Sequence, residues 1–136
     1  MSVDMIEIHL PTDRTVKGPR ITKDGERLVV EYDYEHDDGS TQWTRIAFDE
    51  VLYYEYRCNV CCRADDILSP NQIRCQDESE THTAILKLWA ESVGWHEWQK
   101  EKGGSARFRH FTVYFDDAGS IDAIAASCDV EKPVAL

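Results

Sequence analysis

The feature that most limits how this chain can fold is the alternation of apolar and polar residues over 28–35. A period of two is typical of a β-strand that buries one face. Residues 37–40, Asp-Asp-Gly-Ser, follow as a turn, and residues 43–48 form a second apolar-rich stretch. The pattern therefore predicts a β-hairpin near the middle of the N-terminal half.

The register of this hairpin can also be predicted, because a slip by one residue turns every side chain to the other face. A two-residue turn at Asp38-Gly39 would mix apolar and polar faces. A three-residue loop over 37–39 places apolar side chains on one face and polar side chains on the other, with Gly39 in the left-handed conformation. The three-residue loop predicts the pairs Val30 with Ile46, Leu28 with Phe48, and Glu31 with Arg45.

A second hairpin is predicted near the C-terminus, from Phe108 to Phe115 and from Ile121 to Val130. Its expected pairs are Phe115 with Ile121, Val113 with Ala123, and Phe111 with Ala125. Both faces of this hairpin are mostly apolar, and such strands belong in the middle of a covered sheet.

One main helix is expected between the two hairpins. Asp77 or Ser79 can cap its N-terminus, and Gly94 is a good C-terminal stop. Ile85, Leu88 and Trp89 recur at helical spacing, which predicts the buried stripe. We expect Trp89, Trp95 and Trp98 to pack between helix and sheet.

These elements predict a single α+β domain over residues 1–136. Its sheet is predominantly antiparallel and consists of two hairpins plus one or two extra strands, packed by the helix. Residues 3–9 and 51–56 are the expected extra strands, and residues 58–79 are expected to be irregular. Residues 10–25 are expected to form a loop or mobile arm, and residues 132–136 a frayed tail.

Composition excludes several classes of protein. Hydrophobic residues make up 42% of the chain, too many for a disordered one. No stretch approaches the ~18 apolar residues of a membrane span, and the acidic N-terminus is unlike a signal peptide, so we expect a cytoplasmic protein. The formal charge of −11 disfavours direct binding to nucleic acid or to an anionic membrane, and it favours encounter with a basic partner.

The five cysteines carry the only metal-like pattern. Their odd number argues against a disulfide framework. The weak candidates for a metal site are Cys58, Cys61, Cys75 and His82. Structural zinc sites usually carry two Cys-x-x-Cys pairs, and only one is present here. We therefore expect no metal and no cofactor, although the zinc alternative stays open.

Motifs for catalysis are absent. There is no glycine-rich phosphate loop and no Gly-x-Ser-x-Gly elbow. The predicted register places His110 and Cys128 on one face, where they could form a nucleophilic pair. Because this face is predicted to be buried, we prefer a packed thiol beside a hydrogen-bonded imidazole. We therefore expect no enzyme.

The acidic residues are partly organised along the first hairpin. Glu31, Asp33 and Glu35 share one strand face, and the predicted register places Trp43 on the same side. An exposed tryptophan beside carboxylates is a suitable composition for binding a cationic surface. The alternatives are a solvated polar face and a tryptophan that packs on the sheet. The predicted partner-binding residues are Glu31, Asp33, Glu35, Asp37, Asp38 and Trp43.

Two stretches resemble a known group of proteins. One runs from Asp38-Gly39-Ser40 through Trp43, Ile46 and Phe48 to Tyr53-Tyr54, and the other from His110-Phe111 through residues 113–117 and Gly119 to Ile124-Ala125. Together they resemble small bacterial proteins found among the immunity proteins of polymorphic toxin systems. The resemblance implies a cytosolic inhibitor that binds one toxin and does no chemistry, and it assigns no binding residue.

Three functional hypotheses follow. The first is an acidic cytoplasmic binding protein, of immunity or inhibitor type, that neutralises a basic protein. The second is a small enzyme or zinc-binding domain with a site near His110 and the Cys58–Cys75 loop. The third, ranked lowest, is a nucleic-acid mimic, because the acidic ridge is short.

Overall fold

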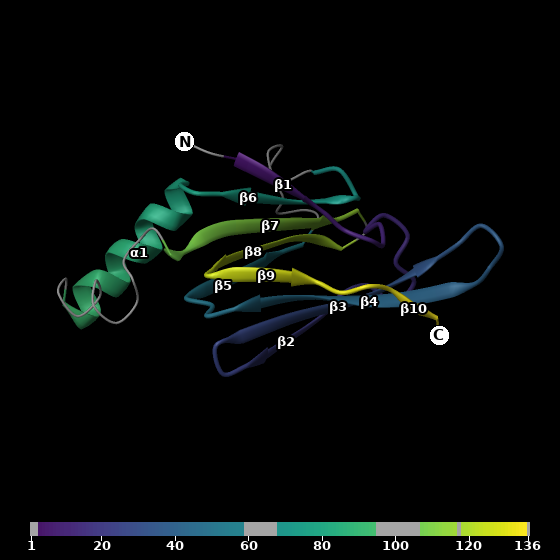
Figure 1. Ribbon diagram of the computed structural model, residues 1–136, viewed down its shortest axis with the longest axis horizontal. Helices are drawn as coiled ribbons and strands as arrows, with labels where there is room; N and C mark the ends of the chain where they lie inside the picture. The colour runs from purple at the N-terminus through teal and green to yellow at the C-terminus, as the bar shows by residue number, and fades with distance from the viewer. Residues whose placement is uncertain (1–2, 59–67, 95–106, 117, 136) are drawn as a thin grey trace.

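The two predicted hairpins lie in different sheets, and these sheets face each other across a shared apolar core. The computed structural model describes residues 3–58, 68–94, 107–116 and 118–135 (Figure 1). In neighbour order, sheet A contains β1 (Val3–Glu7), β6 (Gln72–Gln76), β7 (Arg109–Phe115), β8 (Gly119–Ala125) and β5 (Tyr53–Arg57). Sheet B contains β10 (Val134–Ala135), β4 (Thr41–Asp49), β3 (Arg27–Glu35) and β2 (Arg20–Asp24), and β9 (Ser127–Val130) also pairs with β4.

All pairings between these strands are antiparallel. The α+β fold class, predominantly antiparallel with two hairpins and one main helix, is therefore confirmed. Within the described residues the structure contains more strands outside the hairpins than the one or two that the sequence indicates.

The core forms where the inner faces of the two sheets meet. Phe48 of β4 lies 5.5 Å from Phe111 of β7, and Tyr32 of β3 meets Phe115 of β7 edge-on at 5.1 Å, both measured between ring centroids. The Tyr32 hydroxyl donates a 2.6 Å hydrogen bond to the carbonyl of Leu10. Each of these aromatic rings buries a large apolar surface, which makes this interface the main source of stability.

The first hairpin has the predicted register. Leu28 pairs with Phe48, Val30 with Ile46, and Glu31 with Arg45. Gly39 has φ +85°, in the left-handed region that favours glycine. The prediction succeeded because one face of the hairpin is apolar and the other is polar.

The second hairpin has the predicted strands but not the predicted register. Phe115 pairs with Gly119 and Val113 with Ile121, two residues away from the expected pairing. A shift of two residues leaves every side chain on the same face, so the apolar pattern cannot detect it. A Cβ atom at Gly119 would lie 2.0 Å from the carbonyl oxygen of Arg57, so only glycine fits where β8 begins against the end of β5.

The single helix of the described residues, α1 (Glu80–Val93), lies at one end of the sandwich (Figure 1). Ser79 is its N-cap and Gly94 its C-cap, as predicted, and the Gly94 backbone N–H donates to the carbonyl of Ala90 at 2.9 Å. Leu86 packs with Phe108 and Ile124, at the end of the outer face of sheet A. The predicted stripe is wrong at Leu88, which is 61% exposed, whereas Leu86 is buried. Trp95 and Trp98 lie outside the described residues.

Three segments contain strands that the sequence did not indicate. The segment 10–25 contains β2, the tail 132–136 contains β10, and the segment 58–79 contains β6. Each is a short strand paired with a longer neighbour, so its position depends on pairing rather than on its own pattern. No helix among the described residues is long and apolar enough to cross a lipid bilayer.

Candidate functional site

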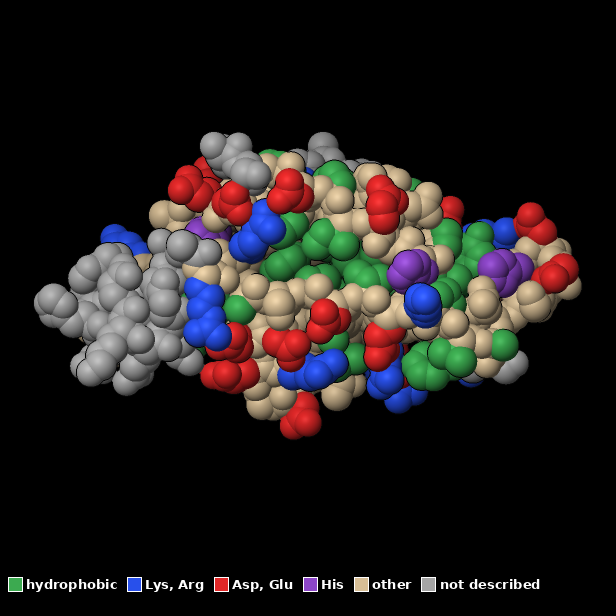
Figure 2. All heavy atoms as spheres, in the orientation of Figure 1, with side chains coloured by type: hydrophobic (Ala, Val, Ile, Leu, Met, Phe, Trp, Pro, Cys, Tyr) green, Lys and Arg blue, Asp and Glu red, His purple; other side chains and the backbone are tan. Residues whose placement is uncertain are grey.

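The tip of the β3–β4 hairpin carries the most exposed carboxylates of the predicted partner-binding set. This hairpin extends beyond the rest of the sandwich (Figure 1), and acidic side chains lie at that end of the molecule (Figure 2). Glu35, Asp37 and Asp38 are all exposed, and the Asp37 side chain is 95% exposed. The fold therefore presents these three charges away from the core.

Two of the tip carboxylates, Asp37 and Asp38, have partners among the described residues. Asp37 pairs with Arg14 at 2.5 Å. Asp38 Oδ1 accepts hydrogen bonds from the Ser40 hydroxyl at 2.6 Å and the Ser40 backbone N–H at 2.8 Å, and these bonds lower the pKa of Asp38. Exposed ion pairs contribute little to stability, so Asp37 is available to exchange Arg14 for another cation.

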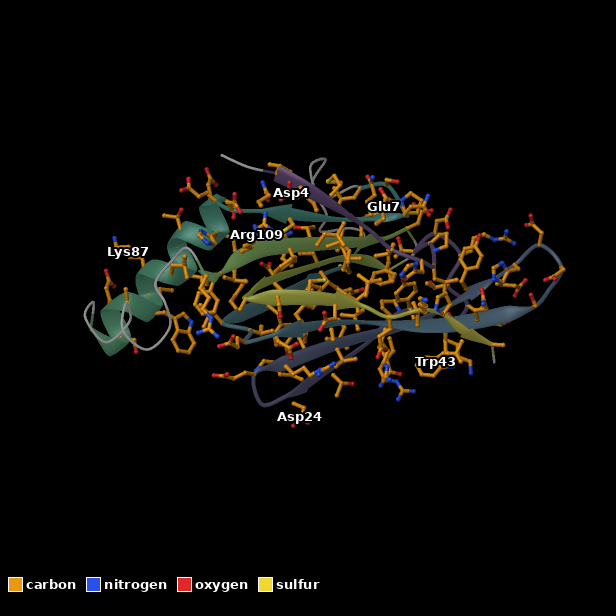
Figure 3. All side chains as sticks on the ribbon, in the orientation of Figure 1. Asp4, Glu7, Asp24, Trp43, Lys87 and Arg109 are labelled. Carbon is orange, nitrogen blue, oxygen red and sulfur yellow. The ribbon has the colours of Figure 1, made fainter. Side chains whose placement is uncertain are left out.

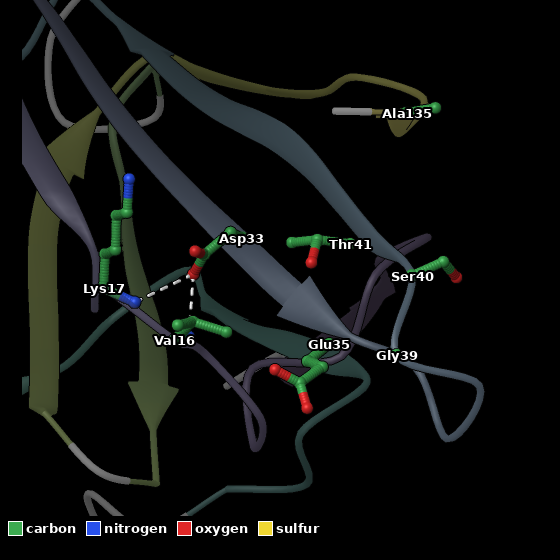
Figure 4. Close-up of a pocket in the computed structure, with 8 residues that line it drawn as sticks. All are labelled: Val16, Lys17, Asp33, Glu35, Gly39, Ser40, Thr41 and Ala135. Atoms are coloured by element: carbon green, nitrogen blue, oxygen red, sulfur yellow. Dashed lines mark hydrogen bonds between the residues drawn. The ribbon is translucent and has the colours of Figure 1, made fainter.

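Asp33 differs from the other predicted partner residues. It is only 8% exposed, and its Oδ1 accepts the backbone N–H groups of Val16 at 2.9 Å and Lys17 at 3.3 Å (Figure 4). Asp33 therefore fastens the segment before β2 onto the outer face of β3. The expectation that Asp33 faces a partner is corrected by this contact, because the segment that it anchors covers it.

Trp43 and Glu31 lie in surroundings of mixed charge. Both are half-buried on the outer face of sheet B, where the Trp43 ring points away from the core (Figure 3). The Arg45 guanidinium carbon lies 5.5 Å from the centroid of the Trp43 ring, and Arg45 also pairs with Glu131 at 2.7 Å. Glu31 has Arg20 and Arg45 as its neighbours on β2 and β4. The acidic character of this surface therefore concentrates at the hairpin tip.

The described members of the weak metal set, Cys58, Cys75 and His82, are not brought together. Cys75 is buried in the core between the sheets, whereas His82 on α1 bonds through Nε2 to the carbonyl of Phe108 at 2.8 Å. Cys58 is exposed, and Cys61 lies outside the described residues. In the part of the chain that the structure describes, no three potential ligands form a group that could hold a metal ion.

The prediction that His110 and Cys128 share one face of a hairpin is wrong. His110 lies on β7 in sheet A, whereas Cys128 lies on β9 in sheet B and pairs with Phe48. Burial raises the pKa of Cys128 to about 12 and also raises that of Cys75, so neither thiol is a thiolate at neutral pH. The chain turns into sheet B after Ala125, which the predicted register did not allow for.

A buried polar cluster on the outer face of sheet A was not predicted. His110 and Thr112 of β7 and Ser120 and Asp122 of β8 are each at most 5% exposed. They alternate with core residues along both strands, so the polar face was visible in the sequence. The sequence also predicted that this face is covered, but the contacts among its polar side chains were missed, because they depend on which residues of β7 and β8 lie opposite each other.

Hydrogen bonds connect this cluster to the start of α1. His110 Nδ1 lies 2.7 Å from the Ser79 hydroxyl, and His110 Nε2 lies 2.6 Å from Asp122 Oδ1. Thr112 donates to the same Asp122 oxygen at 2.7 Å, and Arg57 contacts Asp122 Oδ2 at 2.9 Å. The result is a series of hydrogen bonds from the serine through the imidazole to a carboxylate, both of whose oxygens have hydrogen-bond partners.

The environment of Asp122 keeps it ionised. Burial acts to raise its pKa, but the hydrogen bonds from His110 and Thr112, together with the charge of Arg57, outweigh burial and hold the pKa below its ordinary value. A buried carboxylate with a cation and two donors is a stable arrangement, and losing any one partner is costly.

Comparisons with known proteins identify no relative. No protein-family model, no curated protein and no solved structure matches this chain. The resemblance to immunity proteins therefore stays a prediction, and functional arguments depend on the geometry of the two regions described above.

Proposed function

We propose that this chain is a cytoplasmic binding protein of bacterial immunity or inhibitor type. It binds a basic protein partner, such as a cognate toxin, through the tip of the β3–β4 hairpin. The observation that carries the proposal is the placement of three exposed carboxylates, Glu35, Asp37 and Asp38, on a hairpin that projects from the sandwich.

Charge supports this proposal both through long-range attraction and through direct contact between charged groups. The chain has 26 Asp and Glu against 15 Lys and Arg, and such an excess accelerates encounter with a cationic protein. At contact distance, the Asp37 carboxylate pairs with the guanidinium of Arg14, which supports the tip as a place where a guanidinium can bind. A partner's arginine would replace Arg14 there and gain the neighbouring charges of Glu35 and Asp38.

Trp43 supplies the apolar part of the proposed interface. Aromatic residues next to charged groups dominate the energetics of many interfaces. The Trp43 ring already stacks against the guanidinium of Arg45. Together, the tip carboxylates and Trp43 retain four of the six residues predicted from the sequence. Glu31 lies between Arg20 and Arg45 on the outer face of sheet B, and Asp33 holds the adjoining segment in place.

Affinity capture from the native host tests the proposal. The bait variant Glu35→Lys/Asp37→Lys reverses two tip charges and leaves Asp38, which stabilises the turn, unchanged. The matched control, Asp24→Lys/Asp129→Lys, makes the same change in net charge at two exposed positions elsewhere in sheet B. We expect the wild type and the control to capture one basic protein and the tip variant to lose it.

The result that contradicts the proposal is equally definite. If the tip variant and the control capture the same protein to the same extent, the tip is not the binding surface. If both variants lose it equally, net charge alone accounts for binding, and the hairpin has no special part in it.

A further inference from the structure

The serine at the start of α1 belongs to a hydrogen-bonded chain that the proposed binding function does not use. Ser79, His110 and Asp122 come from three different elements: the helix N-cap, β7 and β8. From their geometry we infer that Ser79 is a nucleophile that accepts acyl groups from small carboxylic esters, with His110 as its general base. This would be a second activity, separate from binding through the hairpin.

The distances satisfy the requirement for such a chain. A nucleophile and its base must lie within about 2.6–3.2 Å, with the base oriented by a third group. The Ser79 hydroxyl and His110 Nδ1 are 2.7 Å apart, and His110 Nε2 and Asp122 Oδ1 are 2.6 Å apart. Here Nδ1 faces the serine and Nε2 faces the carboxylate. Either imidazole nitrogen can accept the proton when the other donates to a carboxylate.

The base is held in one orientation. Asp122 is 1% exposed, and its two oxygens are occupied by His110, Thr112 and Arg57. An ionised carboxylate at this position accepts a hydrogen bond from His110 Nε2, which leaves Nδ1 as the nitrogen that faces Ser79 and can accept its proton. It also stabilises the imidazolium that forms when His110 accepts the serine proton.

The serine is accessible, whereas its base is not. His110 is 5% exposed, but Ser79 is half-buried and lines an open hollow of about 470 Å³. The other residues that line this hollow are Glu78, Glu80, Thr83, Ala84 and Lys87. Two carboxylates beside the nucleophile repel anionic acyl groups, so the hollow suits neutral or cationic esters.

The reaction can be written with its protons and bonds balanced. The Ser79 oxygen attacks the carbonyl carbon while its proton passes to His110 Nδ1. The tetrahedral intermediate then expels the alcohol, which takes the proton from His110. Water attacks the acyl-serine in the same way and releases the carboxylic acid, which restores Ser79. The Ser79 oxygen also accepts a hydrogen bond from the His82 backbone N–H, at 3.0 Å, which holds the oxygen in place beside His110.

Diisopropyl fluorophosphate provides a direct test, because it reacts with an activated serine and leaves a stable phosphoryl group. The folded full-length protein would be incubated with this probe, and the modified peptide identified by mass spectrometry. We expect one phosphoryl group, on Ser79. We also expect slow hydrolysis of p-nitrophenyl acetate, which the probe abolishes.

Two variants separate chemistry from folding. Ser79→Asn removes the hydroxyl but keeps a residue that caps helices well, so the fold is retained and labelling is lost. His110→Gln removes the base and is expected to slow labelling by about 100-fold or more. Ser127→Ala, at an exposed serine on β9, serves as the control and labels like the wild type.

The inference is overturned if folded wild-type protein shows no adduct at Ser79. It is also overturned if ester hydrolysis is unchanged in Ser79→Asn, or if His110→Gln labels at the wild-type rate while its circular dichroism spectrum is native. The hairpin variants are expected to label normally, so failure of the binding proposal and failure of this one are distinguishable.

Discussion

The outer faces of the two sheets use the same residue type in opposite ways. On sheet B, Asp37 at the hairpin tip is 95% exposed and pairs with one exposed arginine. On sheet A, the Asp122 side chain is 2% exposed and has three partners. One aspartate is open to solvent, and the other has its partners inside the protein.

This difference shows that burial, rather than residue type, decides whether a carboxylate is free to contact solvent or is already bonded within the protein. An exposed carboxylate can be removed at little cost to the fold, because water replaces its partners. A buried carboxylate cannot, because its cation and donors stay behind without water. Asp33 lies between these extremes: it is buried, yet its partners are backbone N–H groups near the surface.

The largest expected effect is that of Asp122→Ala. This change leaves Arg57 and Thr112 without their buried acceptor and is expected to destabilise the protein by about 3–5 kcal/mol. The lower end applies if the ion pair of Arg57 with Glu55, at 3.3 Å, compensates in part. Urea unfolding followed by circular dichroism measures the change. A loss below 1 kcal/mol would show that the cluster is solvated and that the contrast between the faces is false.

The pH dependence of the same variant sharpens this prediction. Because folding lowers the pKa of Asp122, its contribution to stability is complete above its ordinary pKa of 3.8 and is lost as the pH falls through the lower folded value. The difference in unfolding free energy between wild type and Asp122→Asn is therefore expected to stay constant near neutral pH and to shrink below pH 3.8. A difference that grows on acidification contradicts the assignment of Asp122 as a stabilising carboxylate.

An intermediate effect is expected for Asp33→Ala. The N–H groups of Val16 and Lys17 lose their acceptor, at a cost of about 1–3 kcal/mol. Hydrogen exchange resolves the local part of this effect, because these two amides are expected to exchange faster while the amides of β7 and β8 keep their rates. Unchanged exchange at both amides would return Asp33 to the group of residues free to contact a partner.

The smallest effect is expected for Asp37→Ala. Its only described partner among charged groups is Arg14, in an exposed pair, so the unfolding free energy is expected to change by less than about 0.5 kcal/mol. Thermal unfolding is a sufficient measurement, with Asp24→Ala as the matched exposed control. A loss near that of Asp33→Ala would place the tip among the structural parts of the molecule.

The first hairpin was predictable from sequence down to its residue pairs because its two faces differ in polarity. The second was predictable only in its strands, since a shift of two residues leaves the same side chains on each face. The short strands β2, β6 and β10 were not predicted at all. Their positions are set by the neighbours with which they pair, which a local pattern does not contain.

The two candidate regions, the hairpin tip and the buried cluster on sheet A, also differ in how far the local sequence pattern determines them. Exposed charges at a turn, such as Asp37 and Asp38, follow from the turn itself. The hydrogen bonds that link Ser79, His110 and Asp122 join residues up to 43 positions apart in the sequence. They depend on three elements meeting in space, so the sequence shows the three residues but not their contact. His110 was noticed as a candidate, but with Cys128, the wrong partner.

The most direct test of the central claim is a map of where a cation binds. Backbone amide shifts of the isotopically labelled protein would be followed by NMR during titration with an arginine-rich peptide at low salt. The account predicts the largest shifts at residues 35–40 and at the Trp43 indole N–H, with none at β7 or β8. Shifts of equal size at Glu78 and Glu80, or spread over all exposed carboxylates, would contradict it.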